Sequence, residues 1–370
     1  MCNFGVFFKK FVTVSLAFLC FTLCICAAKP NVSASSAVLI NAETEEVFFS
    51  KDSHTKRGMA STTKIMTAIL AIEHGSLDEK IKIPAAAIGV EGSSLYLKEG
   101  EEMSMRELLY GLMLRSANDA AEAIAIVIAG SVDAFAYLMN EKAADLGLES
   151  THFTNPHGLA DENHYTTAFD LARLASYALK DETFKEICST KKISLPGNRI
   201  VVNHNKMLFL FEGALGVKTG FTKDSGRCLV SAAKRDGITL VAVTLSAPND
   251  WNDHTDMLEF GFREYELITL AKKGDPLFSL PILGGEKSEV FATVEDDVTV
   301  CLKKDRASIV EQFEIIRPQF APIYAGEQIG RVIYTLNGTK IASAPLVASE
   351  YIGTIEKNQT FLDKLFNILK

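Results

Sequence analysis

The stretch Met59-Ala60-Ser61-Thr62-Thr63-Lys64-Ile65-Met66-Thr67 opens an apolar-periodic segment that stops at His74-Gly75. Apolar residues at helical spacing followed by a glycine predict a helix with Gly75 at its exit. Ser61 and Lys64 lie three positions apart, so they share a helical face with Cβ atoms roughly 5–6 Å apart. A lysine one turn from a serine can take its hydroxyl proton when burial or a second cation keeps the amine neutral. The stretch therefore predicts either a nucleophile and its base, beside the N–H groups of a helix start, or a capping serine with a solvated lysine.

Composition limits the classes of protein to which the chain can belong. It has 370 residues, of which 48% are hydrophobic and 23% charged, and a formal net charge of −8. This length can bury a large core and suggests about two domains. A phosphate-binding protein normally carries a basic excess, so the acidic balance argues against nucleic acid as a partner.

Residues 1–28 are predicted to form a secretory signal peptide. Lys9 and Lys10 precede an almost unbroken apolar run from Phe11 to Cys26, and Ala27-Ala28 follows. A basic start, an apolar centre and small residues at the end are typical of a cleaved signal. An uncleaved membrane anchor is the alternative, although the run is short for a membrane span. In either case we expect the rest of the chain to work outside the cytoplasm.

Cysteines and histidines give no sign of a metal or an organic cofactor. Four of the seven cysteines lie within residues 1–28, and the three that remain form no CxxC pair: Cys188, Cys228 and Cys301. An odd, widely spaced set predicts neither a disulfide framework nor a zinc site. Three histidines fall close together in sequence, His152, His157 and His164. Their spacing fits neither a zinc helix motif nor a Ser-His pair with an adjacent acid, so we interpret them as structural loop residues.

Residues 29–273 have strand-like runs at both ends and helical periods between them. A hairpin is predicted around Asn41–Thr44, and a second tight turn at Asp236-Gly237. The expected helices after the Ser61 segment start near Met105 and span 120–128, 132–146, 167–179 and 251–267, and the expected late strands span 217–220, 228–233 and 238–245. We expect an α+β fold with one antiparallel sheet, helices packed on it, and the first hairpin paired with the last strands.

A boundary is predicted at Gly274-Asp275-Pro276. Residues 274–352 lose the helical period and are expected to form a small β domain, with a tight turn at Asn337-Gly338. In the tail, residues 353–370, apolar side chains fall largely on one helical face: Phe361, Leu362, Leu365, Phe366, Ile368 and Leu369. The tail is too short to span a bilayer, so we expect an amphipathic helix that lies in the membrane interface or, alternatively, docks on the β domain.

Two further motifs follow Ser61 and Lys64 in order. Ser116-Ala117-Asn118 lies between two predicted helices, where its hydroxyl can relay a proton and its amide can hold a substrate carbonyl or orient Lys64. Lys218-Thr219-Gly220 lies on a predicted strand. Lys218 and Thr219 offer a cation and a hydroxyl to a carboxylate, and Gly220 removes a side chain where substrate must lie along the strand edge. Taken singly, each motif has an ordinary alternative, a loop cap and a strand end with a solvated lysine.

The ordered triple of motifs resembles the low-molecular-mass penicillin-binding proteins that are serine-type D-alanyl-D-alanine carboxypeptidases. The resemblance covers most of the mature chain and includes residues 156–159, 164–172 and 225–226. It implies a β-lactamase/transpeptidase-like domain over residues 29–273, a small all-β domain and a membrane-associating tail. One departure from the family is Ala60, since many members have a proline nearby.

The resemblance also implies a role for each site residue. Ser61 would be the acyl-forming nucleophile and Lys64 its base. Ser116 would belong to the proton relay and Asn118 would contact the peptide carbonyl. Lys218 and Thr219 would grip the terminal carboxylate, and the N–H groups of Ser61 and Phe221 would hold the oxyanion.

The function that we expect is removal of the terminal D-alanine from peptidoglycan pentapeptide stems, at the outer face of the cytoplasmic membrane. β-Lactams should acylate the same Ser61. A serine β-lactamase is the nearest rival, but no Glu-x-x-Leu-Asn motif lies between Ser116 and Lys218. A peptidoglycan transpeptidase or endopeptidase and a catalytically silent wall-binding protein remain further alternatives.

Overall fold

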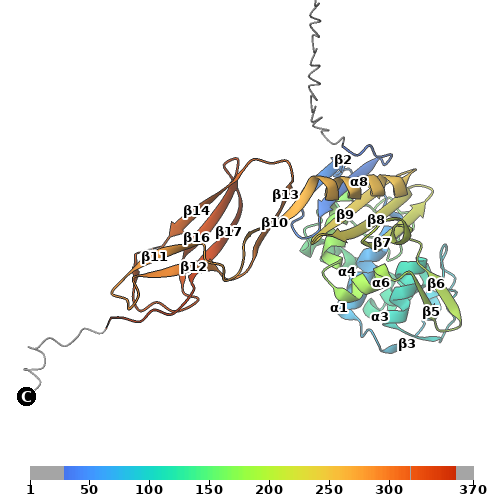
Figure 1. Ribbon diagram of the computed structural model, residues 1–370. Coiled ribbons are helices and arrows are strands. Elements are labelled where there is room, and N and C mark those ends of the chain that lie inside the picture. Colours follow the sequence, from blue (N-terminus) through green and yellow to red (C-terminus); the bar gives the residue numbers. More distant parts are fainter. Residues whose placement is uncertain (1–28, 317, 356–370) are drawn as a thin grey trace, which may run out of the picture.

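The structure is a computed structural model that describes residues 29–316 and 318–355. A domain of sheet and helices is followed by an elongated all-β domain (Figure 1). The predicted signal peptide and most of the predicted amphipathic tail lie outside the described residues.

A five-stranded sheet forms the centre of the first domain, with strand order β2-β1-β9-β8-β7 and every neighbour antiparallel. The strands are β1 Ser36–Asn41, β2 Val47–Lys51, β7 Ala214–Thr222, β8 Gly226–Arg235 and β9 Ile238–Leu245. The predicted pairing of the first hairpin with the last strands is confirmed, since β1 lies beside β9. Asp236 and Gly237 join β8 to β9 with positive φ angles of 48° and 80°, as a two-residue hairpin turn requires.

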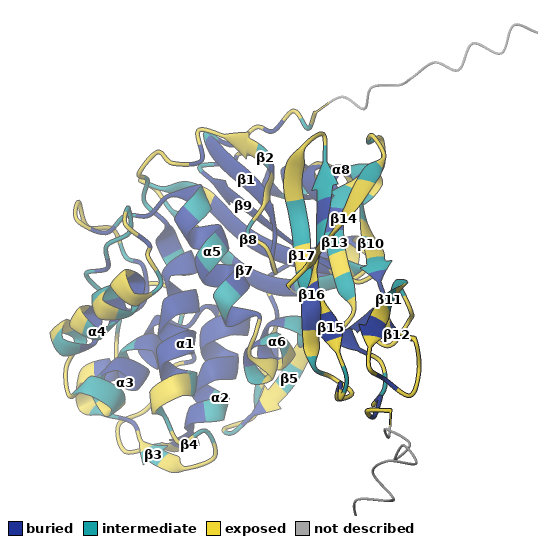
Figure 2. Cartoon of the chain, turned by 90° about the vertical axis from the view of Figure 1, so that its left-hand side faces the viewer, coloured by how far each residue is buried: buried dark blue, intermediate teal, exposed yellow. Residues whose placement is uncertain are grey.

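Helices cover both faces of this sheet, which is why β9 is apolar and buried along its whole length. Alternate residues of β1 point to opposite sides. Val38 and Ile40 join the larger core beneath the helical layer, while Ala37 and Leu39 join a second core under α8 (Asp250–Glu264). Figure 2 shows the buried sheet between α8 and the larger group of helices.

The helical layer carries the first two motifs. A 3₁₀ turn, η1 (Ala60–Thr63), runs into α1 (Lys64–His74), as the apolar period predicts. The other helices of the layer are α2 Met105–Tyr110, the π-helical turn η3 Gly111–Arg115, α3 Asn118–Ala129, α4 Val132–Asp145, α5 Ala168–Ala178 and α6 Glu182–Ser189. The short helix α7 Met207–Leu210 contributes Met207 to the core under α8. Between the helices lie the 3₁₀ turn η2 Ala85–Ala87 and two small hairpins, β3 Lys80–Lys82 with β4 Glu102–Ser104 and β5 Lys192–Leu195 with β6 Arg199–Val202.

Burial of α3 is confined to its first two turns. Residues from Asn118 to Ala125 are largely buried, whereas Val127 is exposed, so the helix is not enclosed on all sides as its composition suggests. No single helix in the described part of the chain has the length and apolarity to cross a membrane. By length and composition alone, α3 and α4 together would be long and apolar enough, but the pair is bent by 83°.

The helix α8 ends earlier than its sequence predicts. It was expected to reach Leu267, but it stops at Glu264, and residues Tyr265–Ala271 form strand β10. β10 pairs with β13 (Val298–Lys303), and the Tyr265 ring stacks on Phe48 of β2 with ring centroids 3.5 Å apart. This tertiary pairing overrides a weak local helix preference. The strand also starts ahead of the predicted boundary at residue 274 and links the two domains.

A six-stranded sheet of order β14-β16-β17-β12-β11-β15 builds the second domain. Its strands are β11 Phe278–Leu283, β12 Glu289–Val294, β14 Ile309–Ile315, β15 Gln319–Phe320, β16 Gln328–Leu336 and β17 Thr339–Ala348. Asn337 and Gly338 close the β16–β17 hairpin with φ angles of 52° and 78°, so the predicted tight turn is confirmed. β11 contains Pro281, a residue that argues against a strand from sequence alone.

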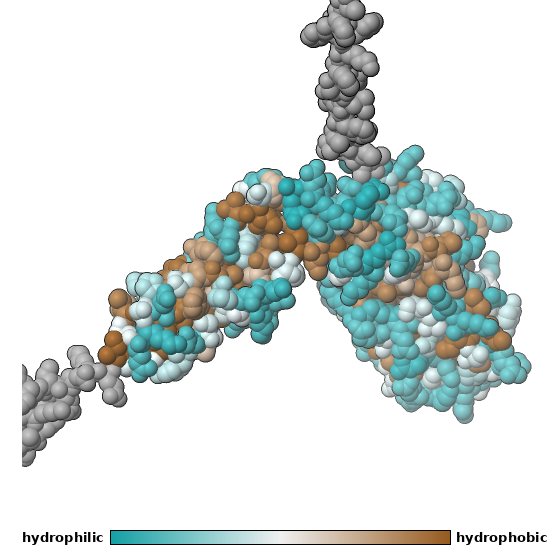
Figure 3. All heavy atoms as spheres, in the orientation of Figure 1, coloured by the Kyte–Doolittle hydropathy of each residue, from teal (hydrophilic) through white to brown (hydrophobic). Residues whose placement is uncertain are grey.

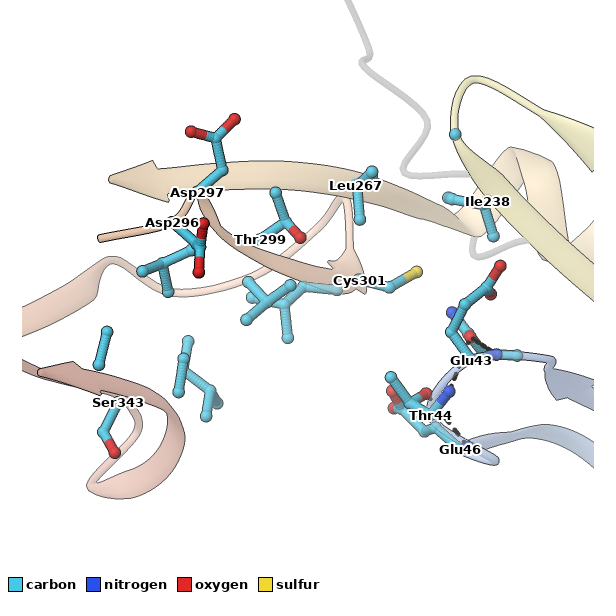
Figure 4. Close-up of a pocket in the computed structure, with 18 of the residues that line it drawn as sticks. Glu43, Thr44, Glu46, Ile238, Leu267, Asp296, Asp297, Thr299, Cys301 and Ser343 are labelled. Atoms are coloured by element: carbon cyan, nitrogen blue, oxygen red, sulfur yellow. Dashed lines mark hydrogen bonds between the residues drawn. The ribbon is translucent and has the colours of Figure 1, made fainter. Parts of the chain in front are cut away.

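A cleft with a volume of about 830 Å³ lies at the junction of the two domains (Figure 4). Glu43 and Glu46 of the β1–β2 turn line one wall, and Asp296 and Asp297 ahead of β13 line the other. None of the predicted site residues lines this cleft.

Candidate active site

Ser61 lies on a tight turn that its neighbours hold in place. The preceding Ala60 has a φ of +48°, a left-handed conformation that L residues rarely adopt. The Thr62 hydroxyl donates to the Met59 carbonyl at 2.6 Å, and the Thr63 hydroxyl donates to the Ala60 carbonyl at 2.9 Å. These bonds support a strained turn that presents Ser61 at the head of α1.

Lys64 is completely buried, and its side-chain nitrogen has three hydrogen-bond neighbours. Nζ lies 3.1 Å from Ser61 Oγ, 2.8 Å from Asn118 Oδ1 and 2.6 Å from the His157 carbonyl oxygen. The alternative of a solvated lysine beside a capping serine is thereby excluded.

Burial and the nearby Lys218 cation lower the pKa of Lys64 well below its usual value. This shift favours the neutral amine, which has two N–H groups and one lone pair. Asn118 Oδ1 and the His157 carbonyl can only accept, so they take the two N–H groups. The lone pair is left for the Ser61 hydroxyl, which is the arrangement in which Lys64 can remove that proton.

A segment around Pro156-His157-Gly158 fixes Lys64 from the side opposite to Ser61. The Thr67 hydroxyl donates to the Pro156 carbonyl at 2.6 Å. A Cβ added to Gly158, whose φ is +86°, would lie 1.9 Å from the Ala60 carbonyl oxygen. Only glycine therefore allows this segment to pack against the turn that carries Ser61.

Two buried histidines hold that segment, and both are neutral. Burial lowers the pKa of His157 to about 3 and that of His164 to about 4. His164 Nδ1 accepts from the Thr154 N–H, so its Nε2 carries the proton and donates to the Thr63 hydroxyl at 2.7 Å. His157 Nδ1 likewise accepts from the Leu159 N–H, and its Nε2 lies 3.4 Å from Glu122 Oε1.

Sequence reasoning did not find the contribution of His157 to the site. The contact uses a backbone carbonyl, which any residue possesses, so the residue type carries no signal. The resemblance of residues 156–159 to the family was the one available indication. The described residues contain no group of three or more His, Cys, Asp or Glu side chains placed to hold a metal.

The Ser116-Ala117-Asn118 motif lies where the π-helical turn η3 ends and α3 begins. Ser116 adopts a left-handed φ of 63°, and its buried hydroxyl has no hydrogen-bond partner among the described residues. Asn118 is held at both ends of its amide, since Oδ1 accepts from Lys64 and Nδ2 donates to the Glu91 carbonyl at 2.5 Å. Asn118 is thus a hydrogen-bond partner of Lys64, and the Ser116 hydroxyl remains free to bond.

Strand β7 brings the third motif against the Ser61 turn. A Cβ on Gly220 would lie 3.0 Å from Ser61 N and 3.1 Å from the Met59 carbonyl oxygen. The space that glycine leaves open is therefore taken up by the backbone that carries Ser61. Thr219 precedes Gly220 on the strand, and Phe221 follows it with its side chain exposed to solvent.

Lys218 is a buried cation that lacks an anion. Its side chain is 1% exposed, and its Nζ donates to the Thr219 carbonyl at 3.0 Å. No acidic side chain in the described ranges pairs with it, and burial lowers its pKa to about 7. A buried charge without a counter-ion is costly, so a carboxylate arriving beside Lys218 would be strongly favoured.

Comparison with known proteins agrees with this geometry. A family model described as D-alanyl-D-alanine carboxypeptidase matches residues 25–249, and one described as the C-terminal domain of penicillin-binding protein 5 matches residues 265–354. The chain belongs to the D-alanyl-D-alanine carboxypeptidase family. Members of this family are serine peptidases, so the chain is a hydrolase with a serine nucleophile.

Curated relatives within the carboxypeptidase family span most of the chain. D-alanyl-D-alanine carboxypeptidase DacF of Bacillus subtilis is 34% identical over 331 residues, which cover 86% of this chain and 85% of the relative. The D-alanyl-D-alanine carboxypeptidase of Streptomyces sp. strain K15 is 35% identical over 258 residues, covering 63% of this chain and 89% of the relative.

Solved structures of similar proteins match either most of the chain or about two thirds of it. Penicillin-binding protein 5 from Haemophilus influenzae matches with a TM-score of 0.71 and 27% identity, covering 88% of this chain and 99% of that one. A Streptomyces K15 DD-transpeptidase variant matches with a TM-score of 0.60 and 34% identity, covering 63% of this chain and 99% of that one. The carboxypeptidase fold is thus shared over both domains with the first protein and over the first domain with the second.

Proposed function

We propose that this carboxypeptidase removes the terminal D-alanine from peptidoglycan stem peptides, with Ser61 as nucleophile and Lys64 as its base. The observation that carries the proposal is the buried Lys64 amine, which touches Ser61 Oγ at 3.1 Å beside a strand with an unpaired Lys218 cation. A hydroxyl, a neutral base and a buried cation in one place suit a peptide that ends in a carboxylate.

The reaction that we propose begins when Ser61 Oγ attacks the carbonyl carbon between the last two residues of the stem. The hydroxyl proton passes to the Lys64 lone pair. As the peptide bond breaks, Lys64 returns this proton through the free Ser116 hydroxyl to the departing D-alanine amine. Water then attacks the ester on Ser61, and Lys64 takes a proton from the water and returns it to Ser61 Oγ as the ester bond breaks. The N–H groups of Ser61 and Phe221 would hold the oxyanion in both steps.

Substrate orientation in this proposal comes from strand β7. Lys218 and Thr219 bind the terminal carboxylate, which supplies the anion that the buried cation lacks. Asn118 already donates and accepts within the protein. To contact the peptide, Asn118 Nδ2 must give up its hydrogen bond to the Glu91 carbonyl and donate to the substrate carbonyl. The hydrogen bond that Asn118 makes in the free protein therefore serves to orient Lys64.

We further propose an envelope location at the outer face of the cytoplasmic membrane. Residues 1–28 have the composition of a secretory signal and residues 361–369 that of an amphipathic helix. β-Lactams, which resemble the acyl donor, are expected to acylate Ser61. Transpeptidation is a second candidate activity, because the Streptomyces K15 protein with a similar solved structure is a DD-transpeptidase.

The decisive experiment measures D-alanine release from a peptide ending in L-lysyl-D-alanyl-D-alanine, with and without an added amine acceptor. Release of free D-alanine in water supports the proposal, whereas formation of peptide–acceptor product without release identifies a transpeptidase. Rapid turnover of penicillin without D-alanine release would identify a β-lactamase. Absence of both reactions, and of a penicillin adduct by mass spectrometry, would leave only a silent binding protein.

The pH dependence of the reaction follows from the two buried lysines. Below the pKa of Lys64 the amine is protonated and cannot accept the Ser61 proton, so kcat/KM should rise as Lys64 deprotonates. Above about pH 7 Lys218 loses its proton in the free enzyme, so kcat/KM should fall again. A bound carboxylate holds the proton on Lys218, so kcat should stay level to higher pH than kcat/KM.

An amide-ended peptide provides the control for the pH prediction. Without a carboxylate to bind, its slower turnover should lack the fall above about pH 7. A value of kcat/KM for the acid-ended peptide that keeps rising to pH 9 would contradict the assignment of Lys218 as the carboxylate ligand.

A further inference from the structure

Five large apolar side chains gather at the end of the β domain that lies farthest from the catalytic domain. They are strongly exposed: Leu283 57%, Phe320 61%, Tyr324 61%, Tyr351 56% and Ile355 61%. We call these five residues the tip patch. Single exposed apolar residues are ordinary on a protein surface, but a contiguous group marks an interaction site.

Strand pairing and backbone hydrogen bonds bring together the segments that carry the tip patch. Leu283 of β11 lies opposite Phe320 of β15 in a parallel pair. The rings of Tyr324 and Tyr351 are in contact, with centroids 5.5 Å apart. The Ile355 N–H donates to the carbonyl of Gly284, the residue after Leu283, at 3.0 Å. Segments far apart in sequence therefore bring the five side chains to one end of the domain.

The tip patch does not form part of the domain core. Its chain neighbours Ile282, Ile323 and Ile352 are buried in the core of the β domain. Because side chains alternate along a strand, burying these isoleucines turns Leu283, Tyr324 and Tyr351 outward. Ile323 and Ile352 also pair across a β-bridge, which fixes Tyr324 and Tyr351 on the outside.

The position of the tip patch indicates what covers it. The described chain leaves this end of the domain at Ile355, directly before the segment whose apolar face includes Phe361, Leu365 and Phe366. Figure 1 shows this exit at the end remote from the catalytic domain, and Figure 3 shows hydrophobic residues beside it. An aromatic patch next to an amphipathic segment has the composition of a membrane-interface belt, in which tyrosine sits at headgroup level.

Charge at the tip does not favour an anionic surface. Lys287 pairs with Glu350, Glu286 and Glu327 place two more carboxylates beside the patch, and no cluster of basic residues accompanies them in the described part of the chain. Electrostatic binding to anionic lipid would need such a cluster. The surface therefore suits insertion of aromatic and aliphatic side chains at the headgroup boundary.

We propose that the tip patch is a second membrane contact, which inserts into the lipid interface beside the tail and sets the orientation of the β domain on the bilayer. The inference rests on the envelope location in the proposed function and deepens it. Two separate contacts hold a domain at a defined angle, whereas one tail joined by a single chain leaves the domain free to rotate. The tip patch would thereby fix the height of the catalytic domain above the membrane.

The test compares binding of residues 29–370 to vesicles of phosphatidylethanolamine and phosphatidylglycerol by co-sedimentation. The Phe320→Ser/Tyr324→Ser double variant should bind about tenfold more weakly, since two large apolar side chains lose their insertion. Phe291→Ser/Val310→Ser, at exposed apolar positions outside the tip patch, is the matched control and should bind as the unsubstituted chain does. In 0.5 M salt the Debye length is about 4 Å, so attraction between surface charges is largely screened. Binding should persist at this salt concentration, because the contact is apolar.

A tail variant, Leu365→Ser/Phe366→Ser, separates the two contacts. It should retain the part of the binding that the tip provides, and combining it with the tip variant should abolish binding. Unchanged binding of the tip variant overturns the proposal. Stronger binding also overturns it, because the tip would then be holding the tail away from lipid. An equal loss in the Phe291/Val310 control would likewise exclude a specific contact.

Labelling with a fluorescent penicillin reports the catalytic proposal independently. The tip and control variants should label as the unsubstituted chain does, which also shows that the catalytic domain is folded. Loss of vesicle binding with full labelling supports the membrane contact. Failure of the unsubstituted chain to label would instead count against the proposed function, whatever its vesicle binding.

Discussion

Replacing Ser61 with alanine is expected to lower the release of D-alanine by at least about 10³-fold. The variant removes the oxygen that forms the acyl bond, while Lys64 keeps its two acceptors, Asn118 Oδ1 and the His157 carbonyl. The base and the Lys218 cation therefore stay in place without a nucleophile. The same variant should form no covalent adduct with penicillin, as measured by intact-protein mass spectrometry.

Ser76→Ala is the matched control for this loss, since Ser76 is an exposed serine just beyond the end of α1. It should release D-alanine and bind penicillin as the unsubstituted chain does. The thermal midpoint of Ser61→Ala should stay close to that of the unsubstituted chain, because the Ser61 side chain is only partly buried. A Ser61→Ala protein that still gains the mass of penicillin would show that another residue is the nucleophile.

Replacing Lys64 with arginine is expected to lower kcat/KM by about 10³-fold or more, a loss similar to that of Ser61→Ala. Burial lowers the pKa of Lys64 and so favours its neutral amine, but a guanidinium remains protonated at any working pH. The variant keeps donors for Asn118 and His157 and loses the lone pair that faces Ser61. Raising the pH should not restore activity, which distinguishes a missing base from a base that is merely protonated.

Two further variants serve as controls for Lys64→Arg. Lys64→Met has a similar length and no amine, and should be equally inactive even if arginine fits the buried site poorly. Lys80→Arg changes an exposed lysine, 51% accessible, and should leave kcat/KM unchanged. Acylation of Lys64→Arg by penicillin within tenfold of the normal rate would contradict the role of Lys64 as the base.

Most elements of the fold could be predicted because their signals are local. The apolar period of α1, the two-residue turns at Asp236-Gly237 and Asn337-Gly338, and the strands that they join follow from a few consecutive residues. The end of α8 could not be predicted in this way. Tyr265 becomes the first residue of a strand because β13 and the Phe48 ring, both distant in sequence, lie beside it.

The candidate site likewise has features that local sequence predicts and features that depend on tertiary contacts. The sequence by itself determined which chemical groups are present and in what order: a serine and a lysine one turn apart, a Ser-x-Asn motif and a Lys-Thr-Gly strand. Only the tertiary structure decided their state. Asn118 and His157, 54 and 93 positions from Lys64, occupy two faces of its amine and leave the third for Ser61. The physical reason is that protonation depends on burial and on neighbouring charge, and residues remote along the chain supply both.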